Sequence, residues 1–166
     1  EDMHDIVAGE HQLLTAQQIW KTVERFLGRT KPGPRLCCVV EEDLLDKLDA
    51  RINQLATSAA MKDEVTTMEP DEQERIFGRL VDPNDEEDVA DCTRDYVEQL
   101  CAPYVEMVEN AGWLRLDRIG MRMLGASSLT AIEWLYLKVQ LAGKVDEAAK
   151  LVVIDEVQDY SAAQLM

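Results

Sequence analysis

Apolar residues recur at helical spacing along most of the chain, and this pattern predicts a mainly α-helical fold. Thr15 and Gln18 have the spacing of a capping box, so we expect a helix to begin there and to end at Gly28. A break rich in Pro and Gly should separate it from a second helix over about residues 35–61. A short strand is the alternative for residues 36–40, because Val and Cys are frequent in strands.

The later helices are predicted from caps and breaks. A short helix should open at Pro70, and a longer one should follow the turn at residues 82–85, which also caps it. Pro103 lies within the longer helix and is expected to kink or break it. A further short helix leads to one that is capped by Ser127 or Ser128. This last helix is apolar almost all round, so we expect it to be buried on more than one side.

One apolar run, Leu-Val-Val-Ile at residues 151–154, departs from the helical pattern and predicts a fully buried strand of the kind found in parallel sheets. Asp155 and Glu156 follow it directly, at the end of the strand where open α/β sheets bind ligands. Two adjacent carboxylates can divide the work of phosphate hydrolysis there. Asp155 would hold Mg²⁺ through its water shell, and Glu156 would orient and deprotonate the attacking water. The alternative is a strand followed by a solvated acidic turn.

The segment 151–161, LVVIDEVQDYS, resembles motif II (the Walker B motif) of superfamily 1 DNA helicases of the UvrD, Rep and PcrA type, and it is most similar to the HelD-like branch. Residues 130–138 are similar to the helix that precedes motif II in that family. The resemblance implies that Asp155 coordinates Mg²⁺ and that Glu156 is the catalytic base. It also implies that Gln158 helps to couple the γ-phosphate to movement.

The fold that the resemblance implies is mainly α. A multi-helix insertion over residues 1–126 would be followed, over residues 127–166, by a helix and by one β-strand and turn of an incomplete RecA-like α/β ATPase domain. The chain contains no G-x-x-x-x-G-K-[ST] loop to cradle phosphates, and it begins at Glu1 without Met. We therefore expect an internal fragment, inactive by itself, of a parent enzyme that is an ATP-dependent DNA helicase. Mg²⁺ and ATP are the cofactors expected in the parent, and neither is expected on the fragment.

Charge narrows the choice of partners. The net charge is −16, with 17 Lys and Arg against 33 Asp and Glu, so the chain as a whole is a poor surface for nucleic acid or anionic membranes. We expect DNA to be bound by other parts of the parent. No apolar run approaches the roughly 20 residues that a membrane helix needs. There is no signal-peptide pattern either, so we expect a cytoplasmic protein without membrane contacts.

The acidity is concentrated between residues 62 and 98, which hold 14 acidic and 4 basic residues. A solvated helical face is one interpretation of this block, and a surface that meets a basic partner is the other. In HelD-like proteins the helical elaborations around the motor engage RNA polymerase, so the resemblance implies that partner. An acidic protein-interaction module is therefore the alternative function. A third possibility is a free-standing helical protein with an accidental motif.

The four cysteines carry no Cys-x-x-Cys spacing and are accompanied by only two histidines, which argues against structural zinc. We interpret them as reduced core residues of a cytosolic protein. A disulfide between Cys92 and Cys101 is the alternative.

Overall fold

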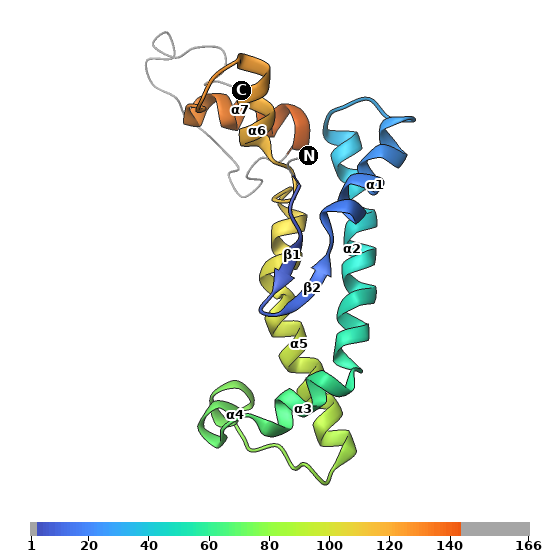
Figure 1. The fold of residues 1–166 in the computed structure, drawn as a ribbon, viewed down its shortest axis with the longest axis vertical. Helices are drawn as coiled ribbons and strands as arrows, with labels where there is room; N and C mark the ends of the chain where they lie inside the picture. Colours follow the sequence, from blue (N-terminus) through green and yellow to red (C-terminus); the bar gives the residue numbers. More distant parts are fainter. Residues whose placement is uncertain (1–2, 144–166) are drawn as a thin grey trace, which may run out of the picture.

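The computed structural model describes residues 3–143, which form seven helices and one small sheet. The elements in chain order are β1 (Ile6–Ala8), β2 (His11–Leu14), α1 (Ala16–Leu27), α2 (Pro34–Ala56), α3 (Ala59–Thr67), α4 (Pro70–Phe77), α5 (Glu86–Glu109), α6 (Leu116–Leu124) and α7 (Ala131–Ala142). The molecule is elongated, with α2 and α5 side by side along its length (Figure 1). Helices α3 and α4 lie at one end, and α6 and α7 lie at the other. The predicted mainly helical fold is confirmed, and the strand predicted at residues 151–154 lies outside the described residues.

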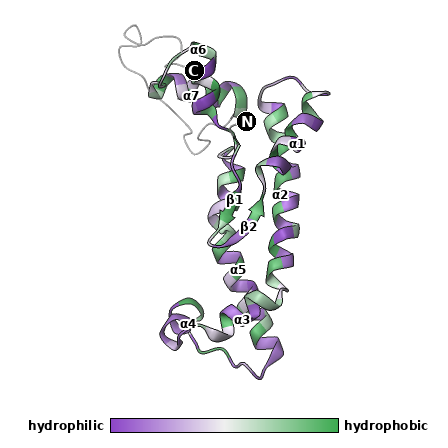
Figure 2. Ribbon diagram, in the orientation of Figure 1, coloured by the Kyte–Doolittle hydropathy of each residue, from purple (hydrophilic) through white to green (hydrophobic). Residues whose placement is uncertain are grey.

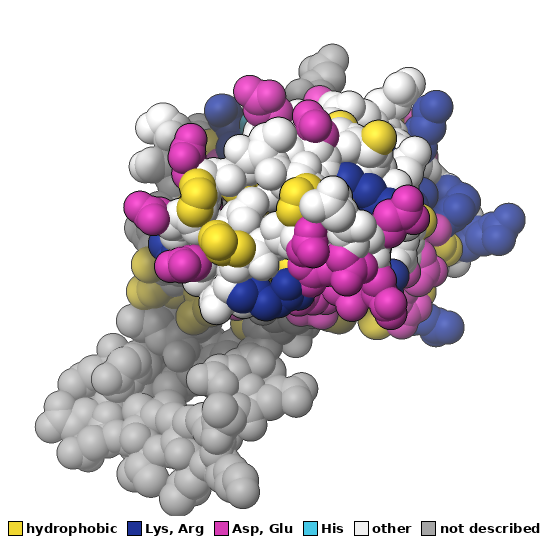
Figure 3. All heavy atoms as spheres, turned by 90° about the horizontal axis from the view of Figure 1, so that it is seen from below, with side chains coloured by type: hydrophobic (Ala, Val, Ile, Leu, Met, Phe, Trp, Pro, Cys, Tyr) yellow, Lys and Arg dark blue, Asp and Glu magenta, His cyan; other side chains and the backbone are white. Residues whose placement is uncertain are grey.

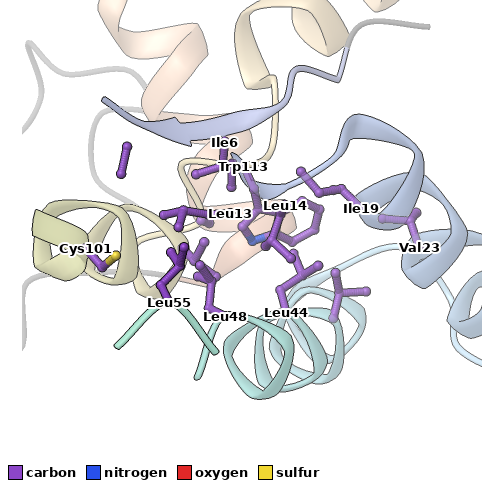
Figure 4. Packing of buried hydrophobic residues seen from close by; sticks show 14 of the residues in the cluster. Ile6, Leu13, Leu14, Ile19, Val23, Leu44, Leu48, Leu55, Cys101 and Trp113 are labelled. Carbon is purple, nitrogen blue, oxygen red and sulfur yellow. The ribbon is translucent and has the colours of Figure 1, made fainter. Parts of the chain in front are cut away.

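The main core lies where the β1–β2 hairpin covers the two long helices. Hydrophobic and hydrophilic residues alternate along α2 and α5, as Figure 2 shows, so each helix offers one apolar face. Leu44 and Leu48 of α2 are fully buried, and Leu13 and Leu14 of β2 point toward them (Figure 4). Burying each such side chain contributes about 1.5–3 kcal/mol, which makes this contact the main support of the fold.

The hairpin was not predicted from the sequence. Strand β1 pairs antiparallel with β2, with Val7 opposite Gln12 and Ala8 opposite His11. The turn between them contains Gly9 at a φ of 58°, a conformation that Gly adopts without strain. Strands of three and four residues carry too little pattern to be recognised and are marginal by themselves. Their contacts with α2 and α5 stabilise them in the folded protein.

The predicted start of α1 and the helical state of residues 36–40 are confirmed, but the predicted end of α2 is wrong. Both hydrogen bonds of the predicted capping box at Thr15 are present, and residues 36–40 are helical rather than extended. However, α2 ends at Ala56 instead of continuing to about residue 61. Ser58 ends it by donating its hydroxyl to the carbonyl of Leu55, and the same oxygen accepts the Met61 N–H to cap α3.

Two later predictions need correction. Of the two outcomes predicted for Pro103, a kink or a break, the break is absent. Helix α5 runs continuously from Glu86 to Glu109, although Pro103 lies inside it and cannot donate a backbone hydrogen bond. Buried side chains on both sides of Pro103, Cys101 and Val108, hold the helix against the core, which outweighs that loss. The cap of α7 is Thr130, in a capping box with Glu133, and not Ser127 or Ser128.

Helix α7 is not buried on more than one side, contrary to the prediction. Ala142 is its buried residue, whereas Leu135 is 54% exposed and three further large apolar side chains, Ile132, Trp134 and Tyr136, are each about two-fifths exposed. Within residues 3–143 the helix contacts α2 and α6, and these contacts leave its large apolar side chains partly exposed. The proposed division between residues 126 and 127 remains a prediction.

All four cysteines are free, so Cys92 and Cys101 form no disulfide. Three are buried, as predicted, and burial raises the pKa of the Cys101 thiol and keeps it protonated. Cys38 is exposed on α2, so the prediction of a core position was wrong there. Its place on the outward face of the helix is the physical reason, because its neighbour Cys37 occupies the inward face.

A polar network joins α1 to α2 beside the core. The Asp43 carboxylate forms ion pairs with Arg25 and Lys47, and it accepts a hydrogen bond of 2.9 Å from the Thr22 hydroxyl. Burial by itself would raise the pKa of Asp43. The hydrogen bonds from Lys47, Arg25 and Thr22 outweigh burial and lower that pKa to about 2.

Replacing Asp43 by Asn is expected to lower the free energy of unfolding at neutral pH by about 1–2 kcal/mol, after allowance for solvent screening of the partly exposed cations. The native carboxylate has a pKa below its ordinary 3.8, so its contribution is present above that pH and is lost as the pH falls toward 2. Chemical denaturation followed by circular dichroism across this range tests the prediction. Asp46→Asn, at an exposed position of α2, is the control, and an equal effect of the two substitutions would contradict it.

Candidate functional site

The three residues to which the sequence assigns chemistry, Asp155, Glu156 and Gln158, lie outside the described residues. Their roles therefore remain predictions. Within residues 3–143, no cluster of three or more His, Cys, Asp or Glu side chains could hold a metal ion. The feature that the structure does place is the acidic block of residues 62–98.

This block forms one end of the molecule, which we call the acidic end. It comprises most of α3, all of α4, the connection to α5 and the first half of α5. Twelve of its 14 carboxylate side chains are exposed, and only Glu64 and Asp88 are partly buried. Figure 3 looks onto this end and shows Asp and Glu side chains gathered over part of it. The fold thus brings acidic residues from three helices and a connecting segment to one surface.

A small core of its own supports the acidic end. Val65 of α3, Val81 of the connection, and Val89 and Cys92 of α5 are buried together, apart from the main core. Phe77 packs against them from α4. Because four buried side chains make a small core, polar contacts must supply much of the order of this end.

Gln73 of α4 is the central polar contact and is only 6% exposed. Its amide nitrogen donates to the carbonyls of Val65 and Met68 at 3.1 and 3.3 Å, and its amide oxygen accepts the Val81 N–H at 3.1 Å. One side chain therefore joins the end of α3 and the connection to α5 through α4. Sequence analysis missed this residue, because a single Gln in a polar helix carries no signal of burial.

Asp88 of α5 holds the connection in place from the other side. It forms an ion pair with Arg79, and its second carboxylate oxygen accepts the Asp82 N–H at 2.9 Å. These two hydrogen bonds lower the pKa of Asp88. Asp85 is the N-cap of α5 and accepts the N–H groups of Glu87 and Asp88. Both residues are therefore structural and leave other carboxylates for a partner.

Glu64 ties the acidic end to the rest of the molecule. It accepts a hydrogen bond of 2.8 Å from the Tyr96 hydroxyl, and its other oxygen lies 3.4 Å from Nε2 of His11 in β2. Burial and the hydrogen bond to Glu64 raise the pKa of Tyr96 to about 12. The carboxylate links α3, α5 and the hairpin, so the acidic end is held on the two-helix body.

Glu86 and Glu87 are the carboxylates best placed to meet another molecule. Both are exposed in the first turn of α5, where the helix dipole favours negative charge. Neither makes a side-chain hydrogen bond or ion pair to another described residue. An exposed pair of carboxylates of this kind can attract a basic surface.

The comparisons with known proteins add no family. No family model, no curated protein and no solved structure matches the chain. Among the helices of residues 3–143, none has the length and apolar character required to span a bilayer.

Proposed function

We propose that the chain is part of an ATP-dependent DNA helicase or translocase of the HelD-like kind. The observation that carries this proposal is the sequence LVVIDEVQDYS at residues 151–161. The strand predicted at residues 151–154, followed directly by two carboxylates, matches the chemical needs of Mg²⁺ binding and water activation. The helical region at residues 3–143 would be an insertion that precedes this strand, in a cytoplasmic parent enzyme.

In the proposed motor each motif residue has a separate role. Asp155 would bind Mg²⁺, Glu156 would take a proton from the attacking water, and Gln158 would sense the γ-phosphate. ATP would be held by a P-loop in another part of the parent, because this chain contains none.

The coding sequence upstream of Glu1 tests the motor directly. We expect it to encode a G-x-x-x-x-G-K-[ST] loop that follows a predicted strand and opens a helix. Such a loop would supply the backbone N–H groups and the Lys that this chain lacks. A coding sequence that extends upstream without any P-loop would contradict the proposed ATPase.

A second function is favoured by the acidic end. The structure presents 12 exposed carboxylates on a surface that has its own core and a link to the body. A surface of this charge suits a basic protein better than a phosphate backbone. We propose that it is a protein-interaction module, with RNA polymerase as the partner that the HelD-like resemblance implies.

Reversing the charge of Glu86 and Glu87 to Lys is expected to weaken polymerase binding about tenfold or more and to make the remaining binding less sensitive to salt. Asp88 is left unchanged because it supports the fold through Arg79. The measurement is capture of purified RNA polymerase by the immobilised chain over a salt series. Reversal of Glu42 and Asp46, exposed carboxylates of α2, is the matched control.

Equal loss of binding in both pairs would mean that net charge, and not the acidic end, governs the interaction. Unchanged binding after the reversal of Glu86 and Glu87 would contradict the module.

A further inference from the structure

Among residues 3–143, the end opposite the acidic end carries more basic than acidic side chains in α1 and α6. Residues 15–35, which span α1 and the start of α2, hold five basic residues and one acidic residue, Glu24. Arg118 and Arg122 of α6 are exposed at the same end. In Figure 1, α6 and the connection between α1 and α2 lie far from α3 and α4. The described residues therefore present acidic and basic side chains at opposite ends, although the net charge of the chain is −16.

A groove lies between α1 and α6 at this end, with a volume of about 400 Å³. We call it the basic groove. Trp20 contributes from α1, and Arg118, Ile119, Arg122 and Met123 contribute from α6. Trp20 is 44% exposed and Met123 is 71% exposed. The Trp20 ring, Ile119 and Met123 form an apolar floor that can hold an apolar side chain. The neighbouring guanidinium groups can pair with carboxylates on either side of that side chain.

The acidic end offers that combination of groups. Leu80, in the connection between α4 and α5, is 53% exposed. Glu86 and Glu87 follow it in the first turn of α5 and are also exposed. We infer that the acidic end of one copy of this chain docks in the basic groove of a second copy. Leu80 enters the apolar floor, and the two carboxylates face Arg118 and Arg122.

The contact must join two molecules, because helix α2 alone, with 23 residues, separates the ends by about 35 Å. Such a head-to-tail contact leaves one groove and one acidic end unoccupied, so further copies can add. At physiological salt the Debye length of about 8 Å screens repulsion between the distant negative charges of two copies. The close pairs in the groove are screened much less. This inference does not depend on the proposed ATPase or on RNA polymerase.

Sedimentation of the purified chain tests the inference. At physiological salt we expect the mean mass to rise with protein concentration, and we expect this rise to be lost at about 1 M salt. The paired change Arg118→Glu and Arg122→Glu should weaken association at least tenfold, and so should Trp20→Ala alone. Arg29→Glu with Lys31→Glu, at the same end but outside the groove, is the matched control and should leave association unchanged.

Mixing two defective variants gives the sharper result. The groove variant (Arg118→Glu, Arg122→Glu) keeps its acidic end. The acidic variant (Glu86→Gln, Glu87→Gln) keeps its groove, and its neutral side chains do not complement the glutamates introduced in the groove variant. Each should be monomeric alone, and the mixture should form a heterodimer and nothing larger. A wild-type chain that stays monomeric at every concentration would overturn the inference, as would a mixture that stays monomeric. Binding of an oligonucleotide in the groove by a monomeric chain would also overturn it. Because the groove variant keeps its acidic end, it should still bind RNA polymerase, which separates the two proposals.

Discussion

Replacing Glu156 by Gln is expected to lower ATP turnover by the proposed parent enzyme about 10²–10⁴-fold, the size of the effect of a positioned general base. Gln has nearly the same shape as Glu, and it cannot accept the proton of the attacking water at neutral pH. Asp155 is unchanged in this variant, so Mg²⁺ and ATP should bind with affinity close to that of the unsubstituted enzyme. The signature is therefore a loss of kcat with little change in nucleotide binding.

Phosphate release under saturating ATP gives turnover, and a fluorescent ATP analogue gives the affinity of the same preparation. Glu147→Gln, a carboxylate outside the motif, is the control and should keep full turnover. An enzyme that loses only a few-fold in turnover with Glu156→Gln would show that another group activates the water. Loss of nucleotide binding instead of turnover would mean that Glu156 serves the metal.

Replacing Gln73 by Ala is expected to lower the free energy of unfolding of the acidic end by about 2–4 kcal/mol. The substitution removes the partner of two carbonyl groups, those of Val65 and Met68, and of the Val81 N–H. A buried N–H or C=O group that loses its hydrogen-bond partner destabilises the fold by about the free energy of removing that group from water. Only a small core is present there to compensate.

Hydrogen exchange measures this effect where it arises. The Val81 amide should exchange much faster in Gln73→Ala, whereas the amides of α2 near Leu44 should keep their protection, because the main core is separate. Glu74→Ala, one position along in α4 and exposed, is the control. Unchanged protection of Val81, or equal effects of the two substitutions, would contradict the role of Gln73.

The stability of the acidic end should affect both of its proposed contacts. If Gln73→Ala loosens α4 and the connection, then Leu80 and the carboxylates of the first turn of α5 lose their fixed relative positions. Both proposed contacts of this end, with RNA polymerase and with a second copy, should then weaken although no charge has changed. Loss through disorder differs from loss through charge reversal, because it leaves the salt dependence of the remaining binding intact.

Local signals in the sequence predicted much of the helical architecture. The Thr15 capping box, the end of α1 at Gly28, the break before Pro34 and the turn that caps α5 are all present. Each depends on hydrogen bonds or backbone angles within a few residues, so the chain encodes it locally. The concentration of charge in residues 62–98 could be counted directly, and the fold leaves most of it exposed.

Predictions that required knowledge of neighbouring segments failed. The hairpin is too short to be recognised and depends on α2 and α5, and Pro103 does not break α5, because the core holds both sides of it. Helix α7 has an apolar sequence, yet one face remains open in the described structure. Gln73 and the basic groove involve residues far apart in the chain, which no local pattern brings together.

The sequence by itself determined the helical class, most caps, the acidic block and the motif at residues 151–161, because these depend on neighbours along the chain. Only the tertiary structure decided which carboxylates support the fold and which face solvent. It bound Asp88 to Arg79 and left Glu86 and Glu87 exposed, although all three lie in one turn. The tertiary structure also places the acidic end and the basic groove at opposite ends of the α2–α5 pair. Packing across the chain produces these differences, because a charge acquires its role from the groups that the fold places around it.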